Sequence, residues 1–222
     1  MYKELLWVFT QLPNDYIVLD TETTGLPDEN GLPDIVTLGI TVVSNREIAE
    51  SVEFKTRPQK RISEEAQSIH GITNEQAAGF DYFDSQWSQM AEYLNDQLIV
   101  IHNASYDWPI LLDHVERHRL AMPEIQGVFC SQKAAIPWAQ AMNLLCSHRG
   151  PSLGTLTKAL GVDDLRVKLG GLHGARIDSR QTASAVEVMS CLLYTSPSPR
   201  DSCIHLVCRL LLEKGGGGGG GG

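Results

Sequence analysis

Two acidic residues at the end of an apolar segment constrain this chain more than any other feature. The apolar run Tyr16 to Leu19 leads directly into Asp20-Thr21-Glu22, a pattern typical of a buried strand that ends in carboxylates. Because side chains alternate along a strand, Asp20 and Glu22 leave the same face. Two carboxylates that close repel each other unless a cation lies between them. The sequence therefore predicts a divalent-metal site at a strand end.

Two later segments supply further acids for such a site. The apolar segment Leu98 to Ile101 leads into His102-Asn103 and then Asp107, and the glycine-rich residues 169–172 lead into His173 and then Asp178. An Asp-x-Glu motif is weak evidence by itself, but these three motifs in this order and spacing are strong evidence together.

The three motifs resemble those of the DEDDh (DnaQ-like) family of 3′→5′ exonucleases. Residues 69–73 (Ile-His-Gly-Ile-Thr) and 152–156 (Ser-Leu-Gly-Thr-Leu) are similar to the segments that precede the family's second and third motifs. The resemblance covers roughly Tyr16 to Ser190. It implies an α/β fold of the ribonuclease H-like type, a single domain with a mixed sheet flanked by helices.

The pattern of apolar residues agrees with a sheet followed by alternating strands and helices. Strands are predicted at Tyr16–Asp20, Ile35–Val43, Glu47–Phe54 and Leu98–Ile101. Helices are predicted at Ser63–Ile69, around Trp87–Leu94, at Ser105–Arg119, Gln132–Leu145 and Leu153–Leu160, and from Ser179 onward.

The expected metal ligands are Asp20, Glu22, Asp107 and Asp178. Carboxylate oxygens suit hard cations, so we expect two Mg²⁺ or Mn²⁺ ions rather than zinc. Two such ions hold the attacking water and the leaving oxygen of a phosphodiester in line. Release of nucleoside 5′-monophosphates is what the family resemblance implies.

His173 is the candidate general base, because an ordinary histidine pKa of about 6.5 leaves a neutral imidazole at neutral pH. Its five-residue offset from Asp178 predicts that it projects from a loop while Asp178 lies on the next helix. Glycines on both sides of His173 predict a movable loop. We interpret His114 and His118 as surface residues, and His102 equally as a packing or a chemical residue.

The expected substrate contacts follow from the family resemblance. They are Thr23, Thr24, Gly25, Leu26, His70 and Asn103. Gly25 alone has an independent argument, since a residue without Cβ permits close backbone approach. Trp108 is interpreted as a core residue, with base stacking as the alternative.

Composition limits how this chain meets nucleic acid. The 222 residues are 42% hydrophobic and 20% charged, which suits one globular domain, and the net charge is −9. Binding must therefore be local, through bound ions, a few basic residues and stacking. We expect no membrane partner and a cytoplasmic location, because no apolar run approaches the roughly 20 residues of a membrane span and the amino terminus lacks a signal pattern. Only Cys130 and Cys146 precede residue 191, with no metal-type spacing.

The last 32 residues differ in character from the rest. Residues 191–201 (Cys-Leu-Leu-Tyr-Thr-Ser-Pro-Ser-Pro-Arg-Asp) and 206–214 resemble a reading-frame translation of a DNA sequencing adapter, and 215–222 are all glycine. We expect residues 1–190 to form the exonuclease domain and 191–222 to be a non-native, disordered tail. A genuine flexible Ser/Pro/Gly linker is the alternative.

The sequence thus predicts a metal-dependent 3′→5′ exonuclease acting on single-stranded or frayed 3′ ends, with DNA the preferred substrate. One alternative is an exoribonuclease of the oligoribonuclease or ribonuclease T kind. The sequence does not separate the two, because discrimination between DNA and RNA rests on how the pocket meets the 2′-hydroxyl. Another is a proofreading subunit active within a DNA polymerase complex, as the resemblance to the epsilon subunit of bacterial DNA polymerase III allows. An inactive nucleic-acid-binding module is disfavoured by the intact motifs.

Overall fold

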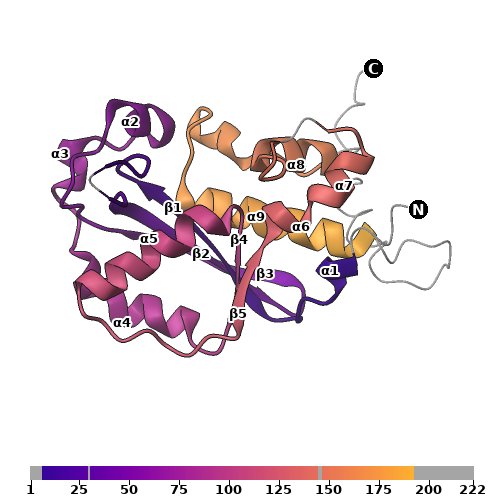
Figure 1. Cartoon of the computed structure of the whole chain (residues 1–222), viewed down its shortest axis with the longest axis horizontal. Coiled ribbons are helices and arrows are strands. Elements are labelled where there is room, and N and C mark those ends of the chain that lie inside the picture. Colours follow the sequence, from indigo (N-terminus) through magenta and orange to yellow (C-terminus); the bar gives the residue numbers. More distant parts are fainter. Residues whose placement is uncertain (1–6, 30, 145–146, 193–222) are drawn as a thin grey trace, which may run out of the picture.

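The computed structural model describes residues 7–29, 31–144 and 147–192. At its centre is a five-stranded sheet in the order β3-β2-β1-β4-β5 (Figure 1). The strands are β1 (Tyr16–Thr23), β2 (Ile35–Ser44), β3 (Glu47–Lys55), β4 (Leu98–Ile101) and β5 (Gly127–Cys130). The first three pair antiparallel, whereas β4 lies parallel to β1 and β5 parallel to β4. This is the mixed sheet flanked by helices that the sequence predicts.

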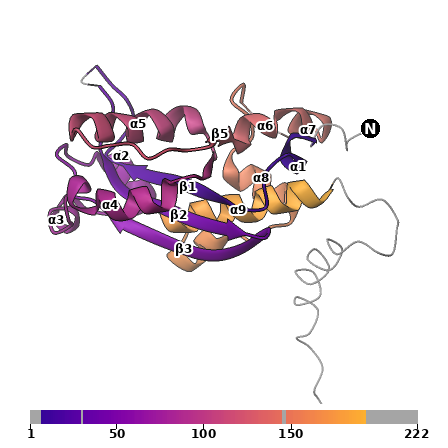
Figure 2. The ribbon, with the colours of Figure 1, turned by 90° about the horizontal axis from the view of Figure 1, so that it is seen from below.

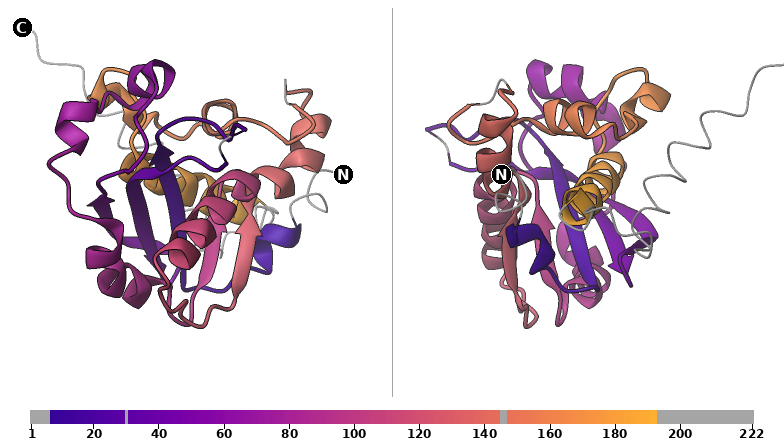
Figure 3. Two further views of the ribbon diagram at one scale, coloured as in Figure 1. Left: turned by 60° about the vertical axis from the view of Figure 1, so that its left-hand side comes forward. Right: turned by 90° about the vertical axis from the view of Figure 1, so that its right-hand side faces the viewer.

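Helices cover both faces of the sheet. The helices of the described residues are α1 (Trp7–Thr10), α2 (Glu64–His70), α3 (Asn74–Ala77), α4 (Phe83–Leu94), α5 (Ala104–Arg117), α6 (Ser131–Ala134), α7 (Ile136–Ala141), α8 (Leu153–Leu160), the 3-10 helix η2 (Leu165–Leu169) and α9 (Ala175–Leu192). One face packs on α9, and the other packs on α4 and α5 (Figures 2 and 3). None of the described helices is long and apolar enough to cross a membrane.

Strand β1 sends alternate side chains into two cores. Tyr16 and Val18 belong to the core shared with α9, whereas Ile17 and Leu19 belong to the core shared with α4 and α5. Since the alternation continues along the strand, Asp20 and Glu22 leave on the side of α9 and Thr21 on the side of α5. The strand therefore aims its two acids at the helix that carries Asp178.

A glycine opposite Asp20 lets that helix approach the sheet. Gly39 of β2 pairs with Asp20 of β1. A Cβ built on Gly39 would lie 2.2 Å from the backbone carbonyl carbon and oxygen of Ala175, the first residue of α9. Only glycine permits this approach, which places the first turn of α9 beside the acidic end of β1.

One predicted helix differs from the structure, and one strand of the sheet was not predicted. The predicted helix Gln132–Leu145 is two short helices, α6 and α7, divided at Ala135; Pro137 has no N–H to continue an α-helix. Strand β5 was not predicted, because a segment of four residues that begins with glycine gives only a weak apolar pattern. Its strand conformation depends on pairing with β4. The predicted tail, apart from Cys191 and Leu192 at the end of α9, lies outside the described residues.

Candidate active site

The carboxyl ends of β1 and β4 open into a cavity of about 420 Å³. Such strand ends are where ligands bind in many α/β sheets. The cavity lining includes all four acids predicted as metal ligands and the predicted base, namely Asp20, Glu22, Asp107, Asp178 and His173. The structure thus brings together side chains that are up to 158 residues apart in the chain.

Among the four acids of the cavity, Asp20 and Glu22 are the two without hydrogen-bond support. Neither side chain has a hydrogen-bond or ion-pair partner in the described part of the chain. Burial, followed by repulsion from Asp107 and Asp178, holds the pKa of Asp20 well above its usual range. Burial and the charge of Asp178 raise the pKa of Glu22 to about 8. Both acids therefore favour either a proton or a nearby cation.

Asp107 enters the cavity from the first turn of α5. Its Oδ1 accepts hydrogen bonds from the hydroxyl of Thr21 at 2.6 Å and from the backbone N–H of Thr21 at 3.2 Å. Burial raises the pKa of Asp107 to about 6, although the two bonds from Thr21 act in the opposite direction. The residue between the two acids of β1 therefore fixes the third acid.

Asp178 lies in the first turn of α9, and His173 lies in the loop before that helix, as predicted. His173 Nδ1 is 3.1 Å from Asp178 Oδ2, and the guanidinium of Arg166 binds both oxygens of Asp178. Burial would raise the pKa of Asp178, but the hydrogen bonds from His173 and Arg166 outweigh it and the pKa is lowered. No sequence motif pointed to Arg166.

The residues present fit a divalent cation. One ligand atom each from Glu22, His173 and Asp178 lie within 4.8 Å of one another. Unsupported, repelling carboxylates such as Asp20 and Glu22 are a donor set that a hard cation stabilises. The imidazole nitrogen in this group was not part of the predicted ligand set.

A larger groove of about 880 Å³ adjoins the cavity and shares Glu22, Asn103 and His173 with it. The expected substrate contacts all line this groove: Thr23, Thr24, Gly25, Leu26, His70 and Asn103. Leu26 is 78% exposed and available to a ligand. Gly25 is required by its φ of +156° rather than by a close neighbour, since an added Cβ would meet Ser63 only at 3.5 Å.

Thr23, at the end of β1, and Thr24, in the loop that follows, act mainly within the protein. The hydroxyl of Tyr106 donates to the carbonyl oxygen of Gly25 at 2.7 Å and lies 2.6 Å from Thr23 Oγ1. Thr23 and Thr24 are buried, so their side chains shape the loop that presents Leu26. Tyr106, which the motif analysis did not single out, is the link between this loop and α5.

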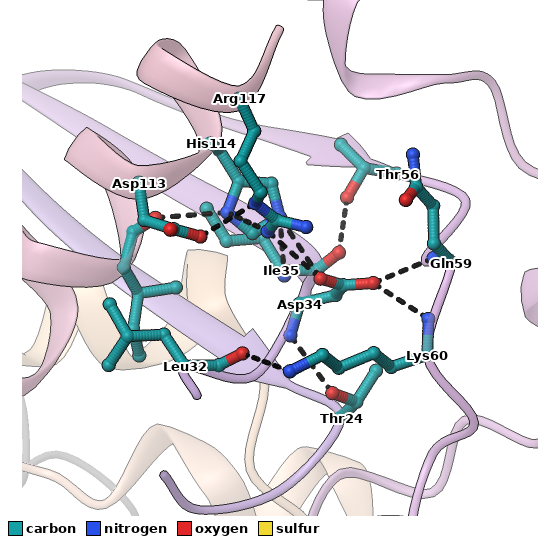
Figure 4. Close-up of polar contacts among 11 residues, drawn as sticks. Thr24, Leu32, Asp34, Ile35, Thr56, Gln59, Lys60, Asp113, His114 and Arg117 are labelled. Atoms are coloured by element: carbon teal, nitrogen blue, oxygen red, sulfur yellow. Dashed lines mark hydrogen bonds and ion pairs between the residues drawn. The ribbon is translucent and has the colours of Figure 1, made fainter. Parts of the chain in front are cut away.

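A buried polar network behind the groove fixes the same loop (Figure 4). The backbone N–H of Asp34 donates to Thr24 Oγ1 at 3.0 Å. The carboxylate of Asp34 accepts from the backbone N–H groups of Gln59 and Lys60 at 2.7 Å and from Arg117 at 2.9 Å. Asp34 thus joins the loop after β1, the loop after β3 and the end of α5.

The interpretation of His114 as a surface residue was wrong. His114 is only 4% exposed, accepts from the backbone N–H of Ile35 through Nε2 and lies 2.9 Å from the Ile110 carbonyl oxygen through Nδ1. Its ring packs on Phe83 with centroids 5.0 Å apart, and the half-buried His118 lies beside the same ring. Helical spacing alone did not reveal that this face of α5 meets β2.

His102 serves packing at the strand end. Its ring nitrogens lie 3.1 Å from Ser131 Oγ and from the carbonyl oxygen of Pro151, and burial lowers its pKa to about 4. Trp108 is half-buried and packs against the core of α4 and α5, which supports the core interpretation.

Comparison with known proteins agrees with this geometry. Residues 17–185 match the RNase T family, described as exonucleases. This chain belongs to the exonuclease family. The exonuclease domain is 28% identical over 168 residues to the PolC-type DNA polymerase III of Thermotoga maritima. This match covers 76% of the chain but only 11% of that polymerase. It is 26% identical over 182 residues to the DNA polymerase III subunit epsilon of Pasteurella multocida, covering 80% of the chain and 69% of the subunit.

Solved structures share the fold of this exonuclease domain. Exonuclease X in complex with 5′ overhanging duplex DNA is 25% identical with a TM-score of 0.54, covering 78% of this chain and 90% of that one. The nuclease domain of 3′hExo, a DEDDh family member bound to rAMP, is 17% identical with a TM-score of 0.62, covering 79% and 91%. Since identity is low, the second likeness concerns the fold alone. The ribonuclease H-like fold expected from the motifs is confirmed.

Proposed function

We propose that this exonuclease domain removes nucleotides from the 3′ end of single-stranded or frayed DNA with the help of two divalent ions, Mg²⁺ or Mn²⁺. The observation that carries the proposal is the position of Asp20, Glu22, Asp107, Asp178 and His173 around one cavity beside an open groove. When bound, two divalent ions would supply the positive charge that activates water and stabilises the leaving 3′ oxygen. Asp20, Glu22, Asp107 and Asp178 would hold them.

His173 has the geometry of a general base. Its Nδ1 faces Asp178 Oδ2, so the hydrogen of a neutral ring belongs on Nδ1 and the lone pair of Nε2 is left to accept a proton. The side chain is 41% exposed, which gives it access to water. Asp178 orients the ring, and the carboxylate also stabilises the imidazolium formed when Nε2 takes the proton.

The groove would hold the terminal nucleotides. Leu26 offers an exposed apolar side chain on which a base can rest, and Asn103 lies where the groove meets the acidic cavity. Arg61 and Arg149 also line the groove, which gives an acidic protein local positive charge for a phosphate backbone. The products would be nucleoside 5′-monophosphates.

Matched oligonucleotides test this proposal. Single-stranded DNA and RNA of one sequence, labelled at the 5′ end, are incubated with the protein in Mg²⁺ or in EDTA. We expect stepwise shortening from the 3′ end in Mg²⁺ only, faster for DNA, with 5′-monophosphates released. Asp20→Asn is the control and should be inactive. No shortening of either strand, or release of the 5′ label first, would contradict the proposal.

A proofreading role within a polymerase complex is the second candidate. The relatives named DNA polymerase III PolC-type and epsilon favour it. It predicts that the domain alone digests paired 3′ ends slowly, and that addition of a bacterial replicative polymerase speeds removal of a mismatched terminal nucleotide. An equal rate with and without the polymerase would favour a stand-alone enzyme.

A further inference from the structure

An arginine side chain enters the acidic cavity. Arg166 of η2 has a side chain only 14% exposed, and its Nε and Nη2 donate to Oδ1 and Oδ2 of Asp178 at 2.7 and 2.8 Å. Two parallel bonds of this kind are the strongest form of arginine–carboxylate pairing. Arg166 therefore covers both oxygens of an expected metal ligand.

The four acids of the cavity consequently differ in their partners. Asp178 meets Arg166 on both oxygens and His173 on Oδ2, whereas Asp20 and Glu22 have no hydrogen-bond partner within the described residues. A divalent ion can reach Asp20 and Glu22 without displacing another group. At Asp178 it must share an oxygen with Arg166 or take one from it.

The protein holds Arg166 in this position. The side chain of Asp164 caps η2 by accepting from the backbone N–H of Arg166 at 3.0 Å. The next support comes from Gln181 of α9, which is fully buried, accepts from the N–H of Leu165 at 3.3 Å and donates to Thr157 of α8 at 3.2 Å. The start of η2 is thus tied to α9 and, through Gln181, to α8, and the Arg166 side chain is itself bound to Asp178 of α9.

We propose that Arg166 is a built-in cation that competes with divalent metal for Asp178 and so sets the metal affinity of the site. The inference rests on the proposed metal-dependent function. Arg166 is a positioning residue in this account, because it acts on Asp178. It stabilises the acidic cavity at low metal concentration and weakens metal binding in return.

Calorimetric titration with MnCl₂ tests the inference on the full chain. Arg166→Gln removes the charge and the paired bonds, and Arg166→Lys keeps the charge without the planar fork. Arg180→Gln is the matched control, because Arg180 is exposed and lies on α9, the helix of Asp178, two residues after that acid. We expect Arg166→Gln to bind Mn²⁺ about tenfold more tightly, Arg166→Lys to lie between it and the parent, and Arg180→Gln to match the parent.

A second readout follows Arg166 itself. In protein labelled with ¹⁵N-arginine, the Nε–H signal of Arg166, assigned by its loss in Arg166→Lys, should shift and exchange faster with water as Mg²⁺ saturates the site. Circular dichroism in EDTA confirms that each variant is folded.

The outcomes separate this inference from the function on which it rests. If the parent binds Mn²⁺ and Arg166→Gln binds it with equal or weaker affinity, the competition is overturned and the proposed function still stands. The same holds if the Arg166 signal does not move at saturating Mg²⁺. Failure of every variant to bind Mn²⁺ would overturn both. Binding by Arg166→Gln at concentrations where the parent binds none would support the inference most strongly.

Discussion

The acidic side chains of the cavity have different electrostatic surroundings, although the motifs make them look equivalent. Burial and the charges of Asp107 and Asp178 oppose ionisation of Asp20, whereas Asp178 is paired with Arg166 and His173. The motifs singled out the four acids and the histidine that the structure brings to one cavity, because each motif lies at the end of an element. They could not identify Arg166, whose role depends on how η2 packs against α9.

We predict opposite stability changes for two isosteric substitutions in EDTA. Asp20→Asn should leave the free energy of unfolding unchanged or raise it, because it removes repulsion from Asp107 and Asp178. Asp178→Asn should lower it by about 2 kcal/mol, because it leaves the Arg166 guanidinium without its carboxylate. Urea unfolding measures both; equal changes would show that Arg166 and Asp178 are not paired in solution.

His173→Ala should slow nucleotide release by about 10²–10⁴-fold, because proton transfer is lost. Mn²⁺ affinity should stay within a few-fold of the parent, since the four carboxylates remain. Single-turnover rates and calorimetry on the same variant measure the two effects. A loss of Mn²⁺ affinity as large as the loss in rate would make His173 a metal ligand instead of a base.

At the scale of elements, the close approach of α9 to β2 decides where Asp178 lies. The sequence shows that a strand carries Gly39, but only the structure shows that Ala175 of α9 meets it at backbone distance. Strands β1, β2, β3 and β4 of the central sheet were predictable from their apolar residues. Strand β5 and the division between α6 and α7 were not, because the first depends on a neighbour and the second on local backbone chemistry.

Gly39→Ala should therefore destabilise the domain by about 2 kcal/mol or more, because the new methyl group cannot fit against the backbone of Ala175. Displacement of α9 should also weaken Mn²⁺ binding. Gly154→Ala is the control, since its Cβ would meet only Arg166 Nη1 at 3.9 Å and alanine favours a helix. Thermal unfolding compares them; equal melting temperatures for the two variants would refute the close contact.

For the whole molecule, buried acids make stability depend on pH. Burial and neighbouring charge raise the pKa of Glu22 to about 8, and burial raises that of Asp107 to about 6, whereas unfolded carboxyls titrate near about 4. Between these values the folded chain keeps protons that the unfolded chain has lost. The free energy of unfolding contributed by these groups therefore falls as pH rises from about 4 to 8. The lowered pKa of Asp178 acts oppositely, with stability lost only at more acidic pH.

In EDTA we accordingly predict a lower melting temperature at pH 8.5 than at pH 5.5. Glu22→Gln should flatten this dependence, because its side chain does not titrate. Saturating Mg²⁺ should reduce the decline, since the ion stabilises the ionised carboxylates. A melting temperature that rises steadily with pH in EDTA would contradict the burial of these acids.

We propose that the four carboxylates together hold two divalent ions. Anomalous diffraction at the manganese edge, from crystals soaked in MnCl₂ and a deoxynucleoside 5′-monophosphate, tests this proposal. We predict two peaks about 3.5–4 Å apart, bounded by Asp20, Glu22, Asp107 and Asp178, with Arg166 withdrawn from at least one oxygen of Asp178. Absence of manganese from this cavity at saturating concentration, or a single ion that contacts neither Asp20 nor Glu22, would contradict the claim.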